Sequence, residues 1–278
     1  ARTAVSVMGL EDKETTDSSP EANMRKALRI FAKTPTALAA FYRIRKGKKI
    51  IKPKKNLTFA ENFFYMCFGK VPQKEIVKAF DVSLILYAEH SFNVSTFTAR
   101  TITSSLSDIH GAITGAIASL KGPLHGGANE EVMHMMNRIK KPENALKWIN
   151  NALKNKEVVM GFGHRVYKSG DSRVPTMRNY FGKVAKLKKD KKFEKIYDIV
   201  EKVMIKKKNI HPNVDYPTGP MYHLMGFDTD FFTPIFVISR ITGWSAHIME
   251  QHAANKLIRP LAKYKGSKHR KVMELNYR

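Results

Sequence analysis

The chain has 278 residues and a mass of 31.7 kDa, which is long enough to bury a large core and excludes a disulfide-stapled mini-protein. Hydrophobic residues make up 43% and charged residues 26% of the sequence, a balance typical of globular rather than disordered or fibrous proteins. There are 49 lysines and arginines against 24 aspartates and glutamates, and the resulting net charge of +25 indicates an anionic partner.

The chain begins with Ala1 instead of methionine, and residues 3–10 already follow an apolar pattern at helical spacing. We therefore expect that an N-terminal part of the protein is missing. The single cysteine, Cys67, lies in an apolar run and is expected to be buried as a small hydrophobic side chain. No segment approaches the roughly 20 apolar residues of a membrane span, and no signal peptide is recognised, so we expect a soluble, cytoplasmic protein.

Apolar residues recur at helical spacing in segment after segment, whereas alternating β-branched runs are scarce, and this pattern predicts an all-α fold. One helical stripe, with small residues between its members, consists of Ile102, Leu106, Ile109, Ile113, Ile117 and Leu120. It predicts a close helix–helix contact or a dimer contact. Further along the chain, Thr233 and Pro234 are expected to supply the N-cap and first turn of a helix that contains Arg240.

Lysines and arginines concentrate in residues 43–55, 183–208 and 263–271. In the second stretch apolar residues intervene among the lysines, which favours the solvated face of amphipathic helices. Nucleic-acid binding is the alternative, but no zinc-finger spacing or RNA-binding signature accompanies the charge. Common catalytic signatures are also absent: there is no Walker A loop, no nucleophile elbow and no His-Glu-x-x-His motif.

Two histidines and one aspartate lie in loops rich in glycine and proline. His125, in GPLHGGAN at 122–129, precedes a helical pattern, and a helix N-terminus would keep its imidazole neutral. His164, in GFGHRVYK at 161–168, is surrounded by glycines and cations that suit a phosphate-bearing ligand. Asp215, in NVDYPTG at 213–219, is a lone carboxylate for which an Asx turn is the alternative. Five other histidines have helical contexts and are interpreted as structural: His110, His134, His223, His247 and His252.

Four motifs resemble citrate synthases in sequence, order and spacing: GPLHGGAN at 122–129, GFGHRVY at 161–167, NVD at 213–215 and FTPIF at 232–236 extended to Arg240. The similarity runs from Ala1 to about Gly266 and lacks the N-terminal helical stretch of the family. It implies an all-α citrate synthase fold and a homodimer. It also implies a large domain of residues 1–125 and 221–278, and a smaller mobile domain of residues 126–220 that closes over substrate.

The resemblance makes His125, His164 and Asp215 the catalytic residues of a condensation between an acyl-CoA and oxaloacetate. Asp215 would remove a proton from the carbon beside the thioester while neutral His125 donates to the thioester oxygen. His164 would act on the ketone oxygen of oxaloacetate, and water would then hydrolyse the citryl-type thioester. CoA enters as a co-substrate, and neither a metal nor a permanently bound cofactor is implied.

The residues implied to hold oxaloacetate are His90, Arg173 and Arg240, with Arg259 reaching the site of the partner subunit. Guanidinium groups suit this role because they bind carboxylates bidentately. The residues implied to contact CoA are Val158, Val159, Met160, Gly161, Phe162, Arg165 and Lys168.

One departure from the family is Ser91, since many citrate synthases carry glutamate after the corresponding histidine. The runs EHSFN at 89–93, GDSRVPTM at 170–177 and YPTGP at 216–220 look most like the 2-methylcitrate synthase branch, whose members use propionyl-CoA and often acetyl-CoA. One methyl group is worth only about 1 to 3 kcal/mol of discrimination, so the sequence does not rank the two. Two alternatives stay open: a citrate synthase using acetyl-CoA in the tricarboxylic acid cycle, and a non-catalytic protein of this fold that binds anions or nucleic acid.

Overall fold

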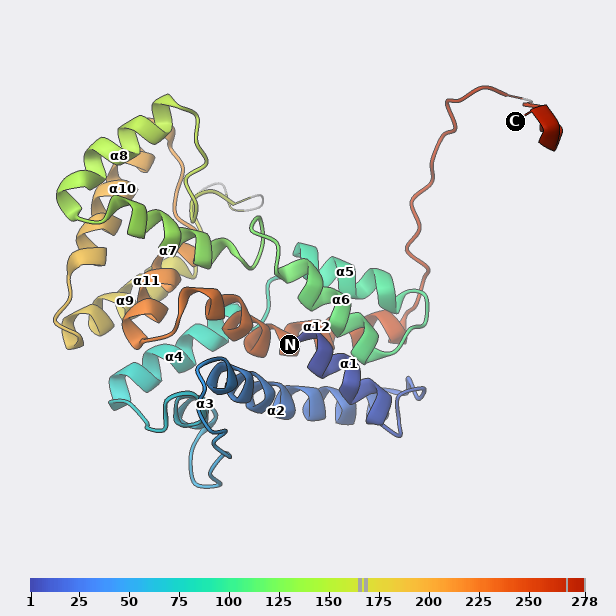
Figure 1. Ribbon diagram of the computed structural model, residues 1–278, viewed down its shortest axis with the longest axis horizontal. Helices are drawn as coiled ribbons and strands as arrows, with labels where there is room; N and C mark the ends of the chain where they lie inside the picture. Colours follow the sequence, from blue (N-terminus) through green and yellow to red (C-terminus); the bar gives the residue numbers. More distant parts are fainter. Residues whose placement is uncertain (165–166, 168–169, 269, 278) are drawn as a thin grey trace.

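The computed structural model describes residues 1–164, 167, 170–268 and 270–277 (Figure 1). Its α-helices are α1 (Arg2–Glu11), α2 (Pro20–Arg45), α3 (Phe59–Phe68), α4 (Lys74–Tyr87), α5 (Val94–Thr103), α6 (Ile109–Leu120), α7 (Ala128–Ile139), α8 (Pro142–Lys154), α9 (Val174–Leu187), α10 (Lys192–Lys208), α11 (Asp215–Met225) and α12 (Phe232–Ala253). Two short 3₁₀ helices are η1 (Thr229–Phe231) and η2 (Leu275–Tyr277). The described residues contain no strand, only an isolated bridge between Phe162 and Pro212, which confirms the predicted all-α class.

Helix α12 lies at the centre of the fold and packs against α2, α4, α5 and α6 (Figure 1). Its buried residues lie all around the helix and include Trp244 and Arg240, as expected for a helix enclosed by others. The helix begins at Phe232, directly after η1, so Thr233 lies in its first turn and is not the predicted N-cap. The backbone N–H of Thr233 instead donates to Oε1 of Glu130 at 3.0 Å, which links α12 to α7.

The apolar stripe of residues 102–120 forms two helices, α5 and α6, and not the single helix that was predicted. Leu106 interrupts it with a φ of 65° and is exposed, and Asp108 then caps α6 by accepting a hydrogen bond from Gly111 N at 2.9 Å. The predicted close approach is confirmed because a Cβ atom at Gly115 would overlap the side chain of Ile102. Whether this surface also contacts a second copy stays a prediction.

Helices α7 to α11 gather on the left of the view in Figure 1, whereas α1, α5 and α6 lie to their right and α2 runs beneath the body toward α3. The division into residues 126–220 and the remainder stays a prediction. The lysine-rich stretch forms the end of α9 and α10, with its apolar residues mostly buried and its lysines mostly exposed, which confirms the amphipathic interpretation. None of the described helices is long and apolar enough to cross a membrane.

Cys67 is buried in α3, as predicted, and burial raises the pKa of its thiol to about 12. The thiol is therefore protonated and has no reactive role at neutral pH. After α12 the chain leaves the helical body along an extended path (Figure 1). Arg259 lies on this segment and is exposed.

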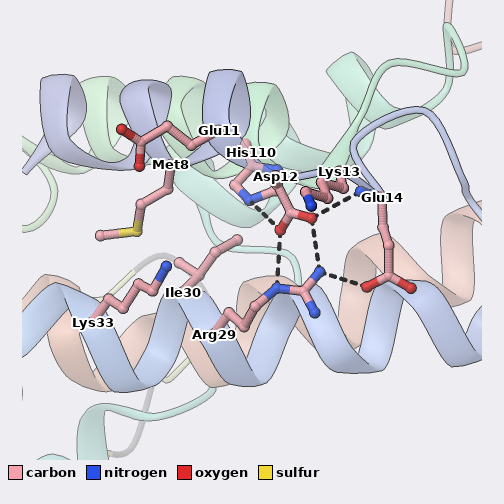
Figure 2. Close-up of a pocket in the computed structure, with 9 residues that line it drawn as sticks. All are labelled: Met8, Glu11, Asp12, Lys13, Glu14, Arg29, Ile30, Lys33 and His110. Atoms are coloured by element: carbon pink, nitrogen blue, oxygen red, sulfur yellow. Dashed lines mark hydrogen bonds and ion pairs between the residues drawn. The ribbon is translucent and has the colours of Figure 1, made fainter.

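An ion-pair cluster fastens α1 to α2 and α6 (Figure 2). Asp12 accepts hydrogen bonds from Nε and Nη2 of Arg29 at 3.0 and 2.8 Å, and Nη2 also donates to Glu14 at 2.7 Å. His110 on α6 lies 3.6 Å from Asp12. Burial would raise the pKa of Asp12, but the Glu14 N–H and Arg29 lower it, so the carboxylate stays ionised. These residues border a cavity of about 450 Å³, where the paired charges serve to hold three helices together.

Candidate functional site

A cavity of about 690 Å³ opens between the C-terminal end of α4, the N-terminal ends of α5, α7, α9 and α11, and the first half of α12. Its lining contains six of the residues assigned by the resemblance: His90, His125, His164, Arg173, Asp215 and Arg240. The fold therefore brings all three candidate catalytic residues together with three of the four candidate oxaloacetate-binding residues, although they span 150 positions of sequence from 90 to 240.

Asp215 is the first residue of α11, where its carboxylate accepts a hydrogen bond from the hydroxyl of Tyr87 at 2.5 Å. The Asx turn at this place is made by Asn213, whose Oδ1 accepts from Asp215 N at 3.1 Å. Burial raises the pKa of Asp215 to about 6, and Tyr87 and Arg173 partly oppose the shift. The group is thus a stronger base than an ordinary carboxylate and is still largely ionised at pH 7.

His125 lies in the turn that precedes α7 and contacts Ser95 through Nε2, which is 2.8 Å from Oγ and 3.2 Å from the backbone nitrogen. Since a backbone N–H can only donate, Nε2 accepts and the imidazole carries its proton on Nδ1. Burial first, and then the charge of Arg240, lowers the pKa of His125 to about 4. The neutral ring expected from the sequence is therefore reached by burial, and it can donate a hydrogen bond from Nδ1.

His90 and His164 face each other with their Nε2 atoms 2.9 Å apart. The backbone N–H of Tyr167 donates to Nδ1 of His164 at 3.2 Å, so neutral His164 carries its proton on Nε2 and donates it to His90. His90 then carries its proton on Nδ1, 3.5 Å from the Tyr167 hydroxyl. Burial lowers the pKa of both rings, that of His90 to about 4, which favours this neutral pair.

Arg240 is buried and still charged, since burial, followed by repulsion from Arg173, lowers its pKa only to about 10. Its Nε donates to the backbone carbonyl of Tyr87 at 2.6 Å, and its guanidinium lies over the ring of Phe236 at 4.7 Å. Its Nη1 is buried without a hydrogen-bond partner among the residues that the structure describes. An unsatisfied buried cation that lines a cavity is suited to bind an anion there.

Arg173 is held at the start of α9 by Asp171, which accepts from its Nε at 2.9 Å and from its Nη2 at 2.7 Å. The same carboxylate accepts from the backbone N–H of Val214 at 3.1 Å. Asp171 therefore fixes both an arginine of the cavity and the residue before Asp215. Nη1 donates to the backbone carbonyl of Leu86 at 3.4 Å, so it is the most weakly held nitrogen of the Arg173 guanidinium.

The stretch predicted to contact CoA lies mostly outside this cavity. Val158, Val159 and Phe162 line a second cavity of about 350 Å³, together with Lys156 and Lys208. Phe162 and Gly163 are consecutive and line the second and the main cavity respectively. Met160 and Gly161 connect Val159 to Phe162, and Gly161 O accepts from Asn213 N at 2.9 Å.

Two residues of that prediction, Arg165 and Lys168, lie outside the described residues. Arg259 lies on the exposed C-terminal segment and does not line the main cavity of this chain. The five histidines interpreted as structural, which lie on α6, α7, α11 and α12, do not line it either. No cluster of three or more potential metal ligands occurs among the residues described.

Sequence reasoning missed three polar residues that shape the site: Tyr87, Ser95 and Asp171. In the sequence, Tyr87 is one more apolar position of α4, and Ser95 is a typical residue for the start of a helix, so neither indicates a functional role. Asp171 stands two residues before Arg173, and that spacing is the one available signal, since it allows a carboxylate and a guanidinium to pair locally.

Together, the all-α fold and the convergence of a raised-pKa carboxylate, neutral imidazoles and buried arginines define an acid–base enzyme for an anionic substrate. The sequence matches the family described as citrate synthase, C-terminal domain, over residues 1–261. This chain belongs to the citrate synthase family, as the resemblance had indicated.

Relatives carry two activities in their names. A citrate synthase of Mycolicibacterium smegmatis is 53% identical over 272 residues, which cover 98% of this chain and 72% of that protein. A 2-methylcitrate synthase of Mycobacterium tuberculosis is also 53% identical, over 269 residues that cover 97% of this chain and 68% of that protein. Among solved structures, Thermoplasma acidophilum citrate synthase with carboxymethyl coenzyme A and oxaloacetate has a TM-score of 0.91 and 34% identity, covering 100% of this chain and 74% of that one.

Proposed function

We propose that this protein condenses an acyl-CoA, either propionyl-CoA or acetyl-CoA, with oxaloacetate to give 2-methylcitrate or citrate and free CoA. The observation that carries the proposal is the placement of Asp215, His125 and His164 around one cavity with Arg173 and Arg240. A base, two neutral hydrogen-bond donors and two cations are the groups that an enolisation followed by attack on a keto dicarboxylate requires. Membership of the citrate synthase family supports the same reaction.

In the first step, the Asp215 carboxylate removes a proton from the carbon next to the thioester carbonyl. The electron pair of that C–H bond moves toward the thioester oxygen, which accepts a hydrogen bond from Nδ1–H of His125. A neutral donor suits this step because its proton affinity is close to that of the forming enol, and the buried site strengthens the hydrogen bond. Acid–base groups of this kind each contribute about 10² to 10⁴ in rate.

In the second step, the enol carbon attacks the ketone carbon of oxaloacetate, and the C=O electron pair moves to the ketone oxygen. The proton that Asp215 removed in the first step ends on this oxygen, which restores the carboxylate. His164 donates from Nε2 to the ketone oxygen, and the hydrogen bond it makes to His90 in the free protein is exchanged for this one. Water then attacks the citryl-type thioester, the C–S bond breaks, and CoA leaves as the thiol. No residue of the chain forms a covalent bond to substrate in this scheme.

Oxaloacetate supplies two carboxylates, and Arg240 and Arg173 are the cations that we assign to them, with His90 as a further donor. Nη1 of Arg240 is the atom best placed for this role because it is buried and has no partner among the described residues. Arg259 would complete the site from the partner subunit of a homodimer. We assign the recess lined by Val158, Val159 and Phe162, beside Lys156 and Lys208, to CoA.

The choice between propionyl-CoA and acetyl-CoA is left open by relatives of both names at 53% identity. The runs at 89–93, 170–177 and 216–220 look most like the 2-methylcitrate synthase branch, and we therefore propose a 2-methylcitrate synthase that also has citrate synthase activity. The non-catalytic alternative has no support from the relatives, which are named citrate synthase or 2-methylcitrate synthase, and the lysine-rich stretch forms the amphipathic end of α9 and α10.

The test is release of the CoA thiol by the purified protein with oxaloacetate, comparing propionyl-CoA and acetyl-CoA at matched concentrations. An Asp215→Asn variant serves as the blank because it keeps the shape of the side chain and removes the base. A higher kcat/KM with propionyl-CoA supports 2-methylcitrate synthase, and a higher value with acetyl-CoA supports citrate synthase. Equal thiol release by the wild type and the blank with both substrates would overturn the proposal.

A further inference from the structure

Tyr87 is a buried residue at the end of α4 that spans the space between this helix and α11. Its hydroxyl donates to Oδ1 of Asp215 at 2.5 Å, a distance typical of a hydrogen bond to a charged acceptor. Burial, and then the charge of Asp215, raises the pKa of Tyr87 well above its usual value. The phenol is thus protonated throughout the working pH range and acts as the donor in this contact.

Tyr87 is held in place at its ring and at its backbone. It packs on Phe236 with ring centroids 4.1 Å apart, and its own backbone carbonyl accepts from Arg240 at 2.6 Å. A hydroxyl on a ring fixed in this way imposes its position on the carboxylate that it contacts, because Tyr87 has little freedom to follow a movement of Asp215. The contact lies at the wall of the main cavity, which both residues line.

We propose that Tyr87 is a positioning residue for the condensation: its hydroxyl holds Oδ1 of Asp215 and thereby turns Oδ2 toward the acidic carbon of the acyl thioester. This positioning role rests on the proposed function, in which Asp215 removes the proton from the acyl thioester. The contact itself, and its effect on the ionisation of the carboxylate, do not depend on that assignment.

The charged groups around Asp215 determine whether its pKa rises or falls when the Tyr87 hydroxyl is removed. Besides Tyr87 from α4, the groups that act on its charge are Arg173 at the start of α9, Arg240 from α12 and Asp171 from the segment before α9. The hydrogen bond from Tyr87 stabilises the ionised carboxylate against the effect of burial. Removing the hydroxyl therefore raises the pKa of Asp215 above its value of about 6.

The kinetic test compares Tyr87→Phe with Tyr222→Phe as a matched control. Tyr222 lies on α11, the helix that begins with Asp215. Its buried hydroxyl is 2.8 Å from Ser83 Oγ, and Tyr222 does not line the cavity. The control variant therefore also removes one buried hydroxyl. Ser83 still donates to Phe80 in the control. For Tyr87→Phe we expect kcat to fall on the order of 10-fold to 10²-fold with an unchanged KM for oxaloacetate. In the same variant, the acid limb of the plot of kcat/KM against pH moves to higher pH. In Tyr222→Phe, kcat and the pH profile stay at their wild-type values.

A second readout does not depend on turnover. In protein with ¹³C-labelled aspartate, the Asp215 Cγ resonance is identified by its loss in Asp215→Asn and titrated by NMR. Its midpoint should rise in Tyr87→Phe and stay unchanged in Tyr222→Phe. If the wild type releases no CoA, the proposed function fails, and this titration alone decides whether Tyr87 tunes the carboxylate.

Identical midpoints in the wild type and Tyr87→Phe, or equal kinetic losses in the two tyrosine variants, would overturn the inference. Folding of each variant is checked by circular dichroism. If Tyr87→Phe does not fold, the wild type is measured in H₂O and D₂O. A deuterium isotope shift of the Asp215 Cγ resonance, carried through the hydroxyl hydrogen bond, supports the inference, and its absence overturns it.

Discussion

Nε of Arg240 donates to the backbone carbonyl of Tyr87 at 2.6 Å, and the hydroxyl of the same tyrosine donates to the Asp215 carboxylate. One residue thus joins the cation proposed to bind oxaloacetate to the base proposed to act on the acyl thioester. The two halves of a condensation must meet within about 3 to 3.5 Å and in a fixed orientation. Because Tyr87 at the end of α4 contacts both Arg240 and Asp215, it can set the distance and orientation between the two substrates.

Arg240→Lys is expected to raise the KM for oxaloacetate by roughly 10-fold or more, because a charge-assisted hydrogen bond worth about 1.5 to 3 kcal/mol is lost or misplaced. Lysine keeps the positive charge but has neither the planar fork nor the Nε that holds the side chain to Tyr87. Steady-state kinetics at saturating acyl-CoA measure the change. Arg138→Lys, an exposed substitution on α7, is the control. An unchanged KM in Arg240→Lys would remove Arg240 from the oxaloacetate site.

Asp215→Asn is expected to stabilise the fold above pH 6 while abolishing turnover. The pKa of Asp215 is raised from 3.8 to about 6 by burial, so the folded protein binds the proton more tightly than the unfolded chain. Stability therefore falls as pH rises from about 4 to 6, and the neutral amide avoids this loss. A shift of this size corresponds to at most about 3 kcal/mol.

Urea unfolding of the wild type and Asp215→Asn between pH 4 and pH 8 tests this predicted dependence of stability on pH. The advantage of the variant should be nearly complete above pH 6 and should become small at pH 4, where the carboxyl is protonated in the folded protein and about half protonated in the unfolded chain. A difference in stability that is constant over this range would show that the charge of Asp215 is not its cause.

Ser95→Ala is expected to lower kcat by about 10-fold and to destabilise the protein by about 1 to 3 kcal/mol. Oγ of Ser95 contacts Nε2 of His125 at 2.8 Å and accepts from Nε1 of Trp244 at 3.1 Å, so the variant leaves a buried indole N–H without its acceptor. The backbone N–H of residue 95 still donates to Nε2, which should keep the proton of His125 on Nδ1. Kinetics, thermal unfolding and ¹⁵N NMR of the imidazole check these three effects. A wild-type kcat would mean that the hydroxyl does not orient His125.

The apolar periodicity was sufficient to predict the helical class, and the resemblance to citrate synthases named six of the residues that line the cavity. Apolar periodicity is set locally, which is why the helices could be recognised. The cavity residues could be named because His125, His164 and Asp215 stand in long motifs with a specific order. That these residues line a single cavity, between the ends of five helices and the first half of α12, follows only from the tertiary fold.

Two predictions were wrong for local reasons that the apolar pattern of the sequence does not reveal. Leu106 continues the stripe of residues 102–120 in sequence, but it takes a left-handed backbone conformation and is exposed, and the cap at Asp108 starts a new helix. Thr233 has the features of an N-cap, but η1 runs directly into α12. Tyr87 and Ser95 were missed because their roles come from partners 128 and 30 residues away along the chain.

Gly243→Ala is expected to weaken both the fold and oxaloacetate binding, because α12 meets the end of α4 at this glycine. A Cβ atom at residue 243 would lie 2.5 Å from the carbonyl oxygen of Ala88, to which Gly243 N donates at 3.0 Å. Neither atom can rotate away, so α12 must move, at a cost of about 1 to 3 kcal/mol. The movement separates Arg240 on α12 from His90, two residues beyond Ala88, and should raise the KM for oxaloacetate.

Gly182→Ala, a substitution within α9, is the matched control, since an added Cβ there meets only the flexible side-chain ends of Arg178 on α9 and Glu194 on α10. Alanine is the better helix former by about 1 kcal/mol, so this variant should be at least as stable as the wild type, with unchanged kinetics. Thermal unfolding and the KM for oxaloacetate are measured for both. If Gly243→Ala matches the control in both measurements, the close approach of α12 to the end of α4 does not set the distance between the two oxaloacetate-binding groups.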